Sequence, residues 1–96
     1  MHHAVVNAGA QVGANVIINT SASIEHDAQV GDHSHISTGA VINGGCEVGR
    51  RVLVGSNAVL KQGIRIQENS IVGAGAVVIQ EIKQAAVVVG NPAKEK

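Results

Sequence analysis

The sequence predicts an all-β chain folded as a parallel β-helix, in which short strands wind around a single core. An aliphatic residue stands at every sixth position from Val6 to Val78, and no insertion interrupts this register. A smaller residue, most often Ala or Ser, stands two positions before each aliphatic. Gly, Asn or Asp stands three positions after nine of the thirteen aliphatics, and these residue types tolerate a positive φ. Each hexad therefore indicates one strand followed by one corner.

The expected strands run from the small residue to the aliphatic, because alternate side chains of a strand enter the same side. In chain order they cover residues 4–6, 10–12, 16–18, 22–24, 28–30, 34–36, 40–42, 46–48, 52–54, 58–60, 64–66, 70–72 and 76–78. A period of six cannot make the 3.6-residue stripe of an amphipathic helix. If three hexads close one triangular coil, equivalent residues of successive coils stack at about 4.8 Å, the distance between paired strands. The hexads then form a prism of about four coils.

Length and composition predict one domain over residues 1–96, with hexads over 6–83 and a C-terminal tail over 84–96. No aromatic residue occurs, which suits a narrow prism filled by small and branched side chains. The formal net charge is zero, so we expect no nucleic-acid partner and no anionic membrane partner. No apolar stretch of about 20 residues occurs, so we expect a cytoplasmic protein. Cys46 falls on an inward position and is expected to be a buried structural thiol.

The residues just before the aliphatics point outward and form three columns, one for each side of the prism. The columns are Val5, Ser23, Val41, Val59 and Val77; Ile17, His35, Leu53 and Ile71; and Gln11, Gln29, Glu47, Arg65 and Lys83. Two columns are mainly apolar and the third is polar. An exposed apolar stripe usually marks an interface, and two different stripes on one subunit suit a closed ring. We therefore expect a homotrimer.

Histidines are the candidate reactive groups. His26 stands between Glu25 and Asp27 at a corner, where a histidine is either a functional group or a solvated turn residue. His35 replaces an aliphatic in the second apolar column, either as an accommodated substitution or as part of a site between subunits. The two histidines are nine positions apart, which is half of an 18-residue coil, so their side chains lie on opposite sides of one prism. Two subunits of a trimer would then build each site.

Three segments carry a family resemblance: Ile24-Glu25-His26-Asp27-Ala28, Val30-Gly31-Asp32-His33-Ser34-His35-Ile36 and Val89-Gly90-Asn91-Pro92-Ala93-Lys94. They resemble the sialic acid O-acetyltransferase and bacterial UDP-amino-sugar N-acetyltransferase family of the hexapeptide-repeat superfamily. The resemblance implies a left-handed β-helix. It also implies the site residues, which are His26 as general base, Asp27 as its acidic neighbour, His35, Ser56, Ala74, Pro92 and Lys94 near acetyl-CoA, and Asn19 near the acceptor substrate.

The implied activity is transfer of the acetyl group of acetyl-CoA to an amine or hydroxyl of a sugar or small molecule. A histidine beside a carboxylate supplies a base of near-neutral pKa. Backbone N–H groups at glycine-rich corners can approach the thioester without obstruction by side chains. Members of this family usually carry an N-terminal sugar-nucleotide domain, whereas this chain starts where their β-helix starts, so we expect no such domain.

Two other functions stay open. One is a trimeric scaffold without catalysis, or a remnant that only binds acetyl-CoA. The other is a γ-class carbonic anhydrase-like metal enzyme, which needs a further histidine on the edge that carries His26. Gly44 and Gln62 stand at the stacked positions instead, so we expect no metal.

Overall fold

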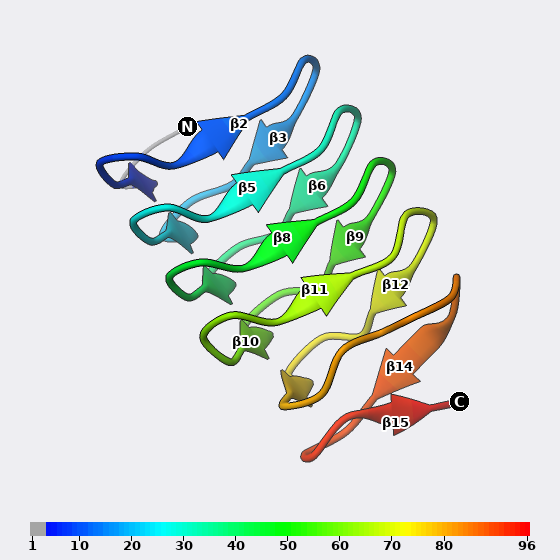
Figure 1. Cartoon of the computed structure of the whole chain (residues 1–96). Coiled ribbons are helices and arrows are strands. Elements are labelled where there is room, and N and C mark those ends of the chain that lie inside the picture. The colour runs from blue at the N-terminus through cyan, green and yellow to red at the C-terminus, as the bar shows by residue number, and fades with distance from the viewer. Residues whose placement is uncertain (1–3) are drawn as a thin grey trace.

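The computed structural model describes residues 4–96, which wind into a parallel β-helix (Figure 1). These residues form no α-helix. The prism measures 30 × 21 × 19 Å along its principal axes. The strands of the described residues are β1 (Val5–Val6), β2 (Gln11–Val12), β3 (Ile17–Ile18), β4 (Ser23–Ile24), β5 (Gln29–Val30), β6 (His35–Ile36), β7 (Val41–Ile42), β8 (Glu47–Val48), β9 (Leu53–Val54), β10 (Val59–Leu60), β11 (Arg65–Ile66), β12 (Ile71–Val72), β13 (Val77–Val78), β14 (Val87–Val89) and β15 (Lys94–Glu95).

Three sheets form the sides of the prism, and successive coils stack along its axis (Figure 1). We call them face A (β1-β4-β7-β10-β13), face B (β2-β5-β8-β11) and face C (β3-β6-β9-β12-β14-β15). Pairing is parallel and joins residues 18 apart, as in Val5 with Ser23, Gln11 with Gln29 and Ile17 with His35. The predicted fold and its 18-residue register are thus confirmed through Val78.

Each hexad strand is one residue shorter than expected, because the small inward residue closes the preceding corner. The amide of Ala22 donates to the carbonyl of Asn19 at 3.1 Å, and that of Ala40 donates to Ser37 at 3.1 Å. Each of these N–H groups closes a turn by donating to the carbonyl of the residue three positions earlier. The ladder of the strand therefore begins one residue later.

The corners adopt the backbone conformation that their residues predict. All nine Gly, Asn and Asp residues of the corner pattern have positive φ. Ser21, His33 and Arg51 occupy the same position in other hexads and also have positive φ. The left-handed conformation is thus a requirement of the corner itself, which Gly and Asn meet with the least strain.

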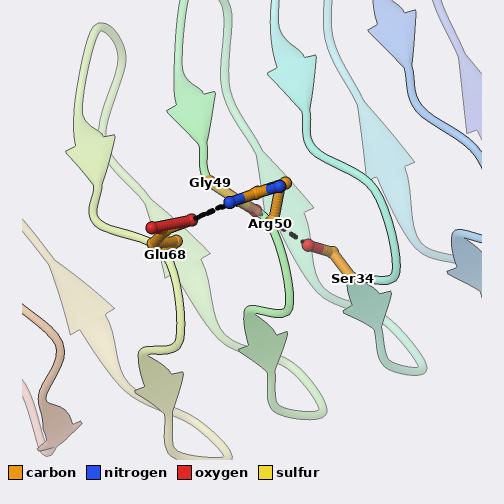
Figure 2. Close-up of polar contacts among 4 residues, drawn as sticks. All are labelled: Ser34, Gly49, Arg50 and Glu68. Carbon is orange, nitrogen blue, oxygen red and sulfur yellow. Dashed lines mark hydrogen bonds and ion pairs between the residues drawn. The ribbon is translucent and has the colours of Figure 1, made fainter.

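The core fills the axis of the prism with aliphatic side chains from all three faces, including Ile24, Ile36, Ile42 and Leu60, which are fully buried. The buried hydroxyl of Ser34 has two hydrogen-bond partners. Ser34 Oγ donates to the carbonyl of Gly49 at 2.8 Å, and the amide of Val52 donates to Ser34 Oγ at 3.1 Å. Figure 2 shows this hydroxyl beside Gly49, close to the outer ion pair of Arg50 with Glu68.

The last coil is two residues shorter than the others. Ile66 pairs with Ile82 and Val72 with Val88, both 16 residues apart. An 18-residue coil would have placed Gln84 and Gly90 at the inward positions. The shorter coil places Ile82 and Val88 at these positions instead. The predicted stacking of Lys83 over Arg65 is therefore wrong, and the carboxylate of Glu81 contributes to the field around Arg65 instead.

The C-terminal segment closes the end of the prism. Strand β14 extends face C beyond β12, and β15 pairs with β14 in antiparallel fashion, with Val89 opposite Lys94. The amide of Ala93 donates to the carbonyl of Val77 at 2.8 Å, which ties the turn to face A. Residues 87–95 thus continue the β-helix as a final hairpin.

Candidate active site

His26 and Asp27 lie at the corner between β4 on face A and β5 on face B. His26 Nδ1 is 3.5 Å from Asp27 Oδ2, and the two side chains are 70% and 76% exposed. Asp27 has a φ of 63°, the left-handed conformation that the corner needs. The adjacent Glu25 points to the preceding coil, where its Oε1 accepts a hydrogen bond from Asn7 Nδ2 at 2.8 Å. Asp27 is therefore the carboxylate beside the imidazole, and water can reach both groups.

Gly44 stacks against His26 one coil further along the chain. A Cβ atom at Gly44 would lie 3.2 Å from His26 Cε1 and 3.3 Å from the carbonyl oxygen of His26. A side chain at position 44 would crowd the imidazole, so glycine allows His26 to keep its position. Sequence reasoning used Gly44 only to argue against a metal site and missed this role, although the 18-residue spacing between the two residues pointed to the contact.

His35 and Asn19 meet on face C. Asn19 Nδ2 is 2.9 Å from His35 Nε2, and both residues are half-buried. His35 pairs with Ile17 on one side and with Leu53 on the other, so its neighbours along the outer column are apolar. Two residues that the family resemblance assigned separately thus form one hydrogen-bonded pair.

Ser56 and Ala74 lie on successive coils at the corner between faces C and A, and both are exposed. The amide of Gly75 donates to the carbonyl of Ser56 at 2.8 Å, which holds the two corners together. A Cβ atom at Gly55 would lie 2.6 Å from the amide nitrogen of Ala74, so only glycine fits at this approach. This corner therefore presents an open stretch of backbone.

Pro92 and Lys94 belong to the hairpin of β14 and β15 and are exposed at the C-terminal end of the prism. The predicted residues thus form separate groups on one chain. His26 and Asp27 lie at the corner between faces A and B, Asn19 and His35 lie on face C, and Ser56 and Ala74 lie at the corner between faces C and A. One prism does not bring these groups together.

Other polar features lie apart from these groups. Cys46 is fully buried, its Sγ donates to the carbonyl of Lys61 at 3.1 Å, and burial raises the pKa of the thiol. A groove follows face B, with Glu47, Arg50 and Arg65 among its lining residues. Within residues 4–96, no three His, Cys, Asp or Glu side chains gather as metal ligands, and no helix could span a membrane.

The fold places this chain in the class of hexapeptide-repeat β-helix proteins. Its candidate site is the corner at which the side chains of His26 and Asp27 are exposed. A scan against family models matches residues 9–44 and 45–80 to the family described as bacterial transferase hexapeptide (six repeats). The chain belongs to this family. A search of curated proteins found no match.

Similar solved structures are acetyltransferases. A histidine-to-asparagine variant of perosamine N-acetyltransferase from Caulobacter crescentus, in complex with CoA and GDP-perosamine, is 32% identical with a TM-score of 0.66 over 97% of this chain and 53% of that chain. Serine acetyltransferase from Neisseria gonorrhoeae is 28% identical with a TM-score of 0.89 over 96% of this chain and 41% of that chain. The chain thus spans about half the length of these enzymes or less.

Proposed function

We propose that this protein is an acetyl-CoA-dependent acetyltransferase whose acceptor is an amine or hydroxyl of a sugar or another small molecule. The observation that carries the proposal is the exposed pair of His26 and Asp27, 3.5 Å apart. An imidazole beside a carboxylate is suited to act as a general base near neutral pH. The 32% identity to an N-acetyltransferase solved with CoA and GDP-perosamine supports this chemistry and a sugar-type acceptor. We further propose that the protein acts in the cytoplasm, where acetyl-CoA is supplied.

The proposed assembly is a homotrimer in which face A of each protomer packs against face C of the next. Outer side chains of face C are large and apolar, with Leu53 37% and Ile71 42% exposed in the single chain. On face A, Val41 and Val59 are paired neighbours in the outer column, and both are partly exposed. Such a ring places His26 of one protomer, at the edge of face A, beside His35 on face C of its neighbour. Each site would then take residues from two protomers.

In the proposed reaction, His26 accepts a proton from the acceptor as its nitrogen or oxygen attacks the carbonyl carbon of the thioester. The new bond to carbon forms, the carbon–sulfur bond breaks, and the CoA sulfur leaves with the proton that His26 returns. Asp27 orients the imidazole and stabilises its protonated form. Cys46 is buried, so no acyl-enzyme intermediate on this thiol is part of the reaction.

For the cofactor groove, the proposal uses His35, the exposed corner of Ser56 and Ala74, and the terminal hairpin. Backbone amides at that corner approach the pantetheine arm, because glycines and small residues leave it uncovered. Lys94, on the exposed strand β15, supplies a charge for a CoA phosphate, and Pro92 shapes the turn before it. Asn19 lies beside His35, within reach of the reacting groups.

Steady-state kinetics over a panel of amino sugars, nucleotide-linked amino sugars and small amines tests the proposal. We expect His26→Ala to lower kcat by about 10²–10⁴-fold, the usual worth of a positioned base. Its affinity for acetyl-CoA, measured by calorimetry, should stay near that of the wild type, because His35 and the corner backbone hold that ligand.

His33→Asn is the matched control, because His33 is also an exposed corner histidine and its φ of 63° suits asparagine. It should leave turnover unchanged. Equal turnover by the wild type and His26→Ala would contradict the role of His26. Absence of acetyl-CoA binding at millimolar concentration would contradict the whole proposal and favour a scaffold.

A further inference from the structure

The contact between Asn19 and His35 has a defined chemical direction. Asn19 Nδ2 lies 2.9 Å from His35 Nε2. An amide nitrogen only donates hydrogen bonds, so the ring nitrogen that faces it must accept. A neutral imidazole that accepts at Nε2 carries its proton on Nδ1. With Asn19 Nδ2 facing the ring, the form of His35 that fits the contact is the neutral one with its proton on Nδ1.

The position of Asn19 is set by its backbone. Its amide donates to the carbonyl of Ile36 at 2.9 Å, and its carbonyl accepts from the amide of Ala22 at 3.1 Å. The first bond ties Asn19 to the coil that carries His35, and the second closes the corner that follows β3. The amide side chain thus starts from a point that is fixed relative to the imidazole.

We infer that Asn19 is a positioning residue that holds His35 as the Nδ1–H form, so that His35 donates a hydrogen bond from Nδ1. Histidine in water favours the Nε2–H form, so a specific partner is needed to reverse that preference. The residues paired with His35 along the outer column are Ile17 and Leu53, which offer no competing polar group. Among residues 4–96, Asn19 is the side chain within hydrogen-bond distance of the ring.

This inference deepens the proposed function and rests on it for its catalytic consequence. The oxygen of the thioester carbonyl gains negative charge when the acceptor attacks, and a fixed N–H donor stabilises that charge. His35 in the Nδ1–H form is such a donor, whereas in the other form Nδ1 carries a lone pair that repels the oxygen. The two histidines then have opposite tasks, since His26 accepts a proton and His35 donates a hydrogen bond.

The tautomer is measured directly by two-bond ¹H–¹⁵N correlation spectra of the full chain labelled with ¹⁵N-histidine, at a pH where the rings are neutral. In the wild type we expect the His35 pattern of the Nδ1–H form. In Asn19→Asp, the carboxylate only accepts, so the pattern should change to the Nε2–H form. In Asn19→Ala, the His35 pattern should shift towards the Nε2–H form, which is the form that free histidine favours.

His26 and His33 serve as internal controls in the same spectra, because neither contacts Asn19, and their patterns should not change. A wild-type His35 in the Nε2–H form would overturn the inference. So would a His35 pattern that is the same in the wild type and in Asn19→Asp. Circular dichroism of each variant shows that the β-helix is retained, and a variant that fails is replaced by Asn19→Ser.

Kinetics gives the second readout. We expect Asn19→Ala and Asn19→Asp to lower kcat by roughly tenfold, less than the 10²–10³-fold expected for losing a donor to the oxyanion altogether. The KM for acetyl-CoA should change less than kcat. Because the spectra need no substrate, a correct tautomer without acetyl transfer would reject the proposed function alone, and transfer with the wrong tautomer would reject this inference alone.

Discussion

Cys46 and Ser34 occupy inward positions that other hexads most often fill with alanine, and both satisfy their polar groups in the same way. Ser34 Oγ donates to the carbonyl of Gly49, and Cys46 Sγ donates to the carbonyl of Lys61, in each case 15 residues further along the chain. The carbonyl of the next coil's corner thus offers an acceptor inside the prism. A polar group at this position costs little when it can reach that carbonyl.

The pH dependence of stability follows from the buried thiol of Cys46. Burial raises the pKa of this thiol in the folded chain. Above roughly pH 8.5, the usual pKa of a free thiol, the unfolded chain releases the proton while the folded chain keeps it. Stability therefore falls as pH rises through this range, because the unfolded state binds fewer protons.

We expect Cys46→Ala to lack this loss of stability, at a cost of about 1 kcal/mol near pH 7 for the missing hydrogen bond. Urea unfolding of both proteins at pH 7 and at pH 10 measures the difference. Lysines contribute equally to both, and the chain has no tyrosine to titrate in this range. An identical change with pH in the two proteins would show that the thiol titrates freely in the folded state.

The three faces of the β-helix differ in their outward-facing side chains. Ion pairs join successive coils on face B and at the corner beside it. Arg65 Nη2 is 2.7 Å from Glu47 Oε2 on the face, and Arg50 Nη2 is 3.0 Å from Glu68 Oε1 at the corner (Figure 2 shows the second). These side chains are largely exposed, so each pair contributes at most about 1 kcal/mol. Faces A and C expose aliphatic columns instead, and this asymmetry is the reason we propose them as the contact surfaces.

Replacing Leu53 by glutamate tests the assembly at the level of one sheet. The change places a charge without a partner in the proposed contact between faces A and C, which is strongly unfavourable. We expect Leu53→Glu to be monomeric and the wild type to have three times the 9.7 kDa mass of one chain in light scattering. Gln29→Glu, which adds the same charge on face B, should remain trimeric. A monomeric wild type would reject both the trimer and the shared site.

The whole molecule consists of coils that are nearly interchangeable. Paired residues are 18 apart on every face through Val78, so each coil places inward, outward and corner residues at the same heights. In a repeat protein of this kind, stability arises within coils and between neighbours. Removal of a complete coil should therefore shorten the prism, whereas removal of an incomplete coil should disrupt it.

We expect deletion of residues 47–64 to leave a folded β-helix, because Arg65 then takes the outward place of Glu47 and Ile66 takes the inward place of Val48. Deletion of residues 48–64 is one residue shorter and moves Arg65 into the core, where an unpaired charge is severely destabilising. Circular dichroism and urea unfolding compare the two chains. Cooperative unfolding of both would show that the register does not control the fold.

Sequence alone determined the repeat fold, the faces and the corners through Val78, whereas the left-handed sense was implied by the family resemblance. A six-residue period with small and large inward positions permits only one strand and one turn per repeat, so the stacking of the coils follows from local geometry. The buried place of Cys46 and the positive φ of Asp27 follow from the same pattern. The roles assigned to His26 and Asp27 came from family resemblance, and they await the kinetic test.

Tertiary structure decided which side chains touch between coils. The hydrogen bond of Asn19 with His35 and the close approach of Gly44 to His26 depend on side-chain directions that periodicity does not specify. Shortening of the last coil replaced Lys83 with Glu81 near Arg65, because burying Ile82 and Val88 is more favourable than burying Gln84 and leaving the place of Gly90 unfilled. The repeat specifies the path of the backbone. The side-chain contacts between coils depend in addition on tertiary packing and hydrogen bonding, which the period of the sequence does not specify.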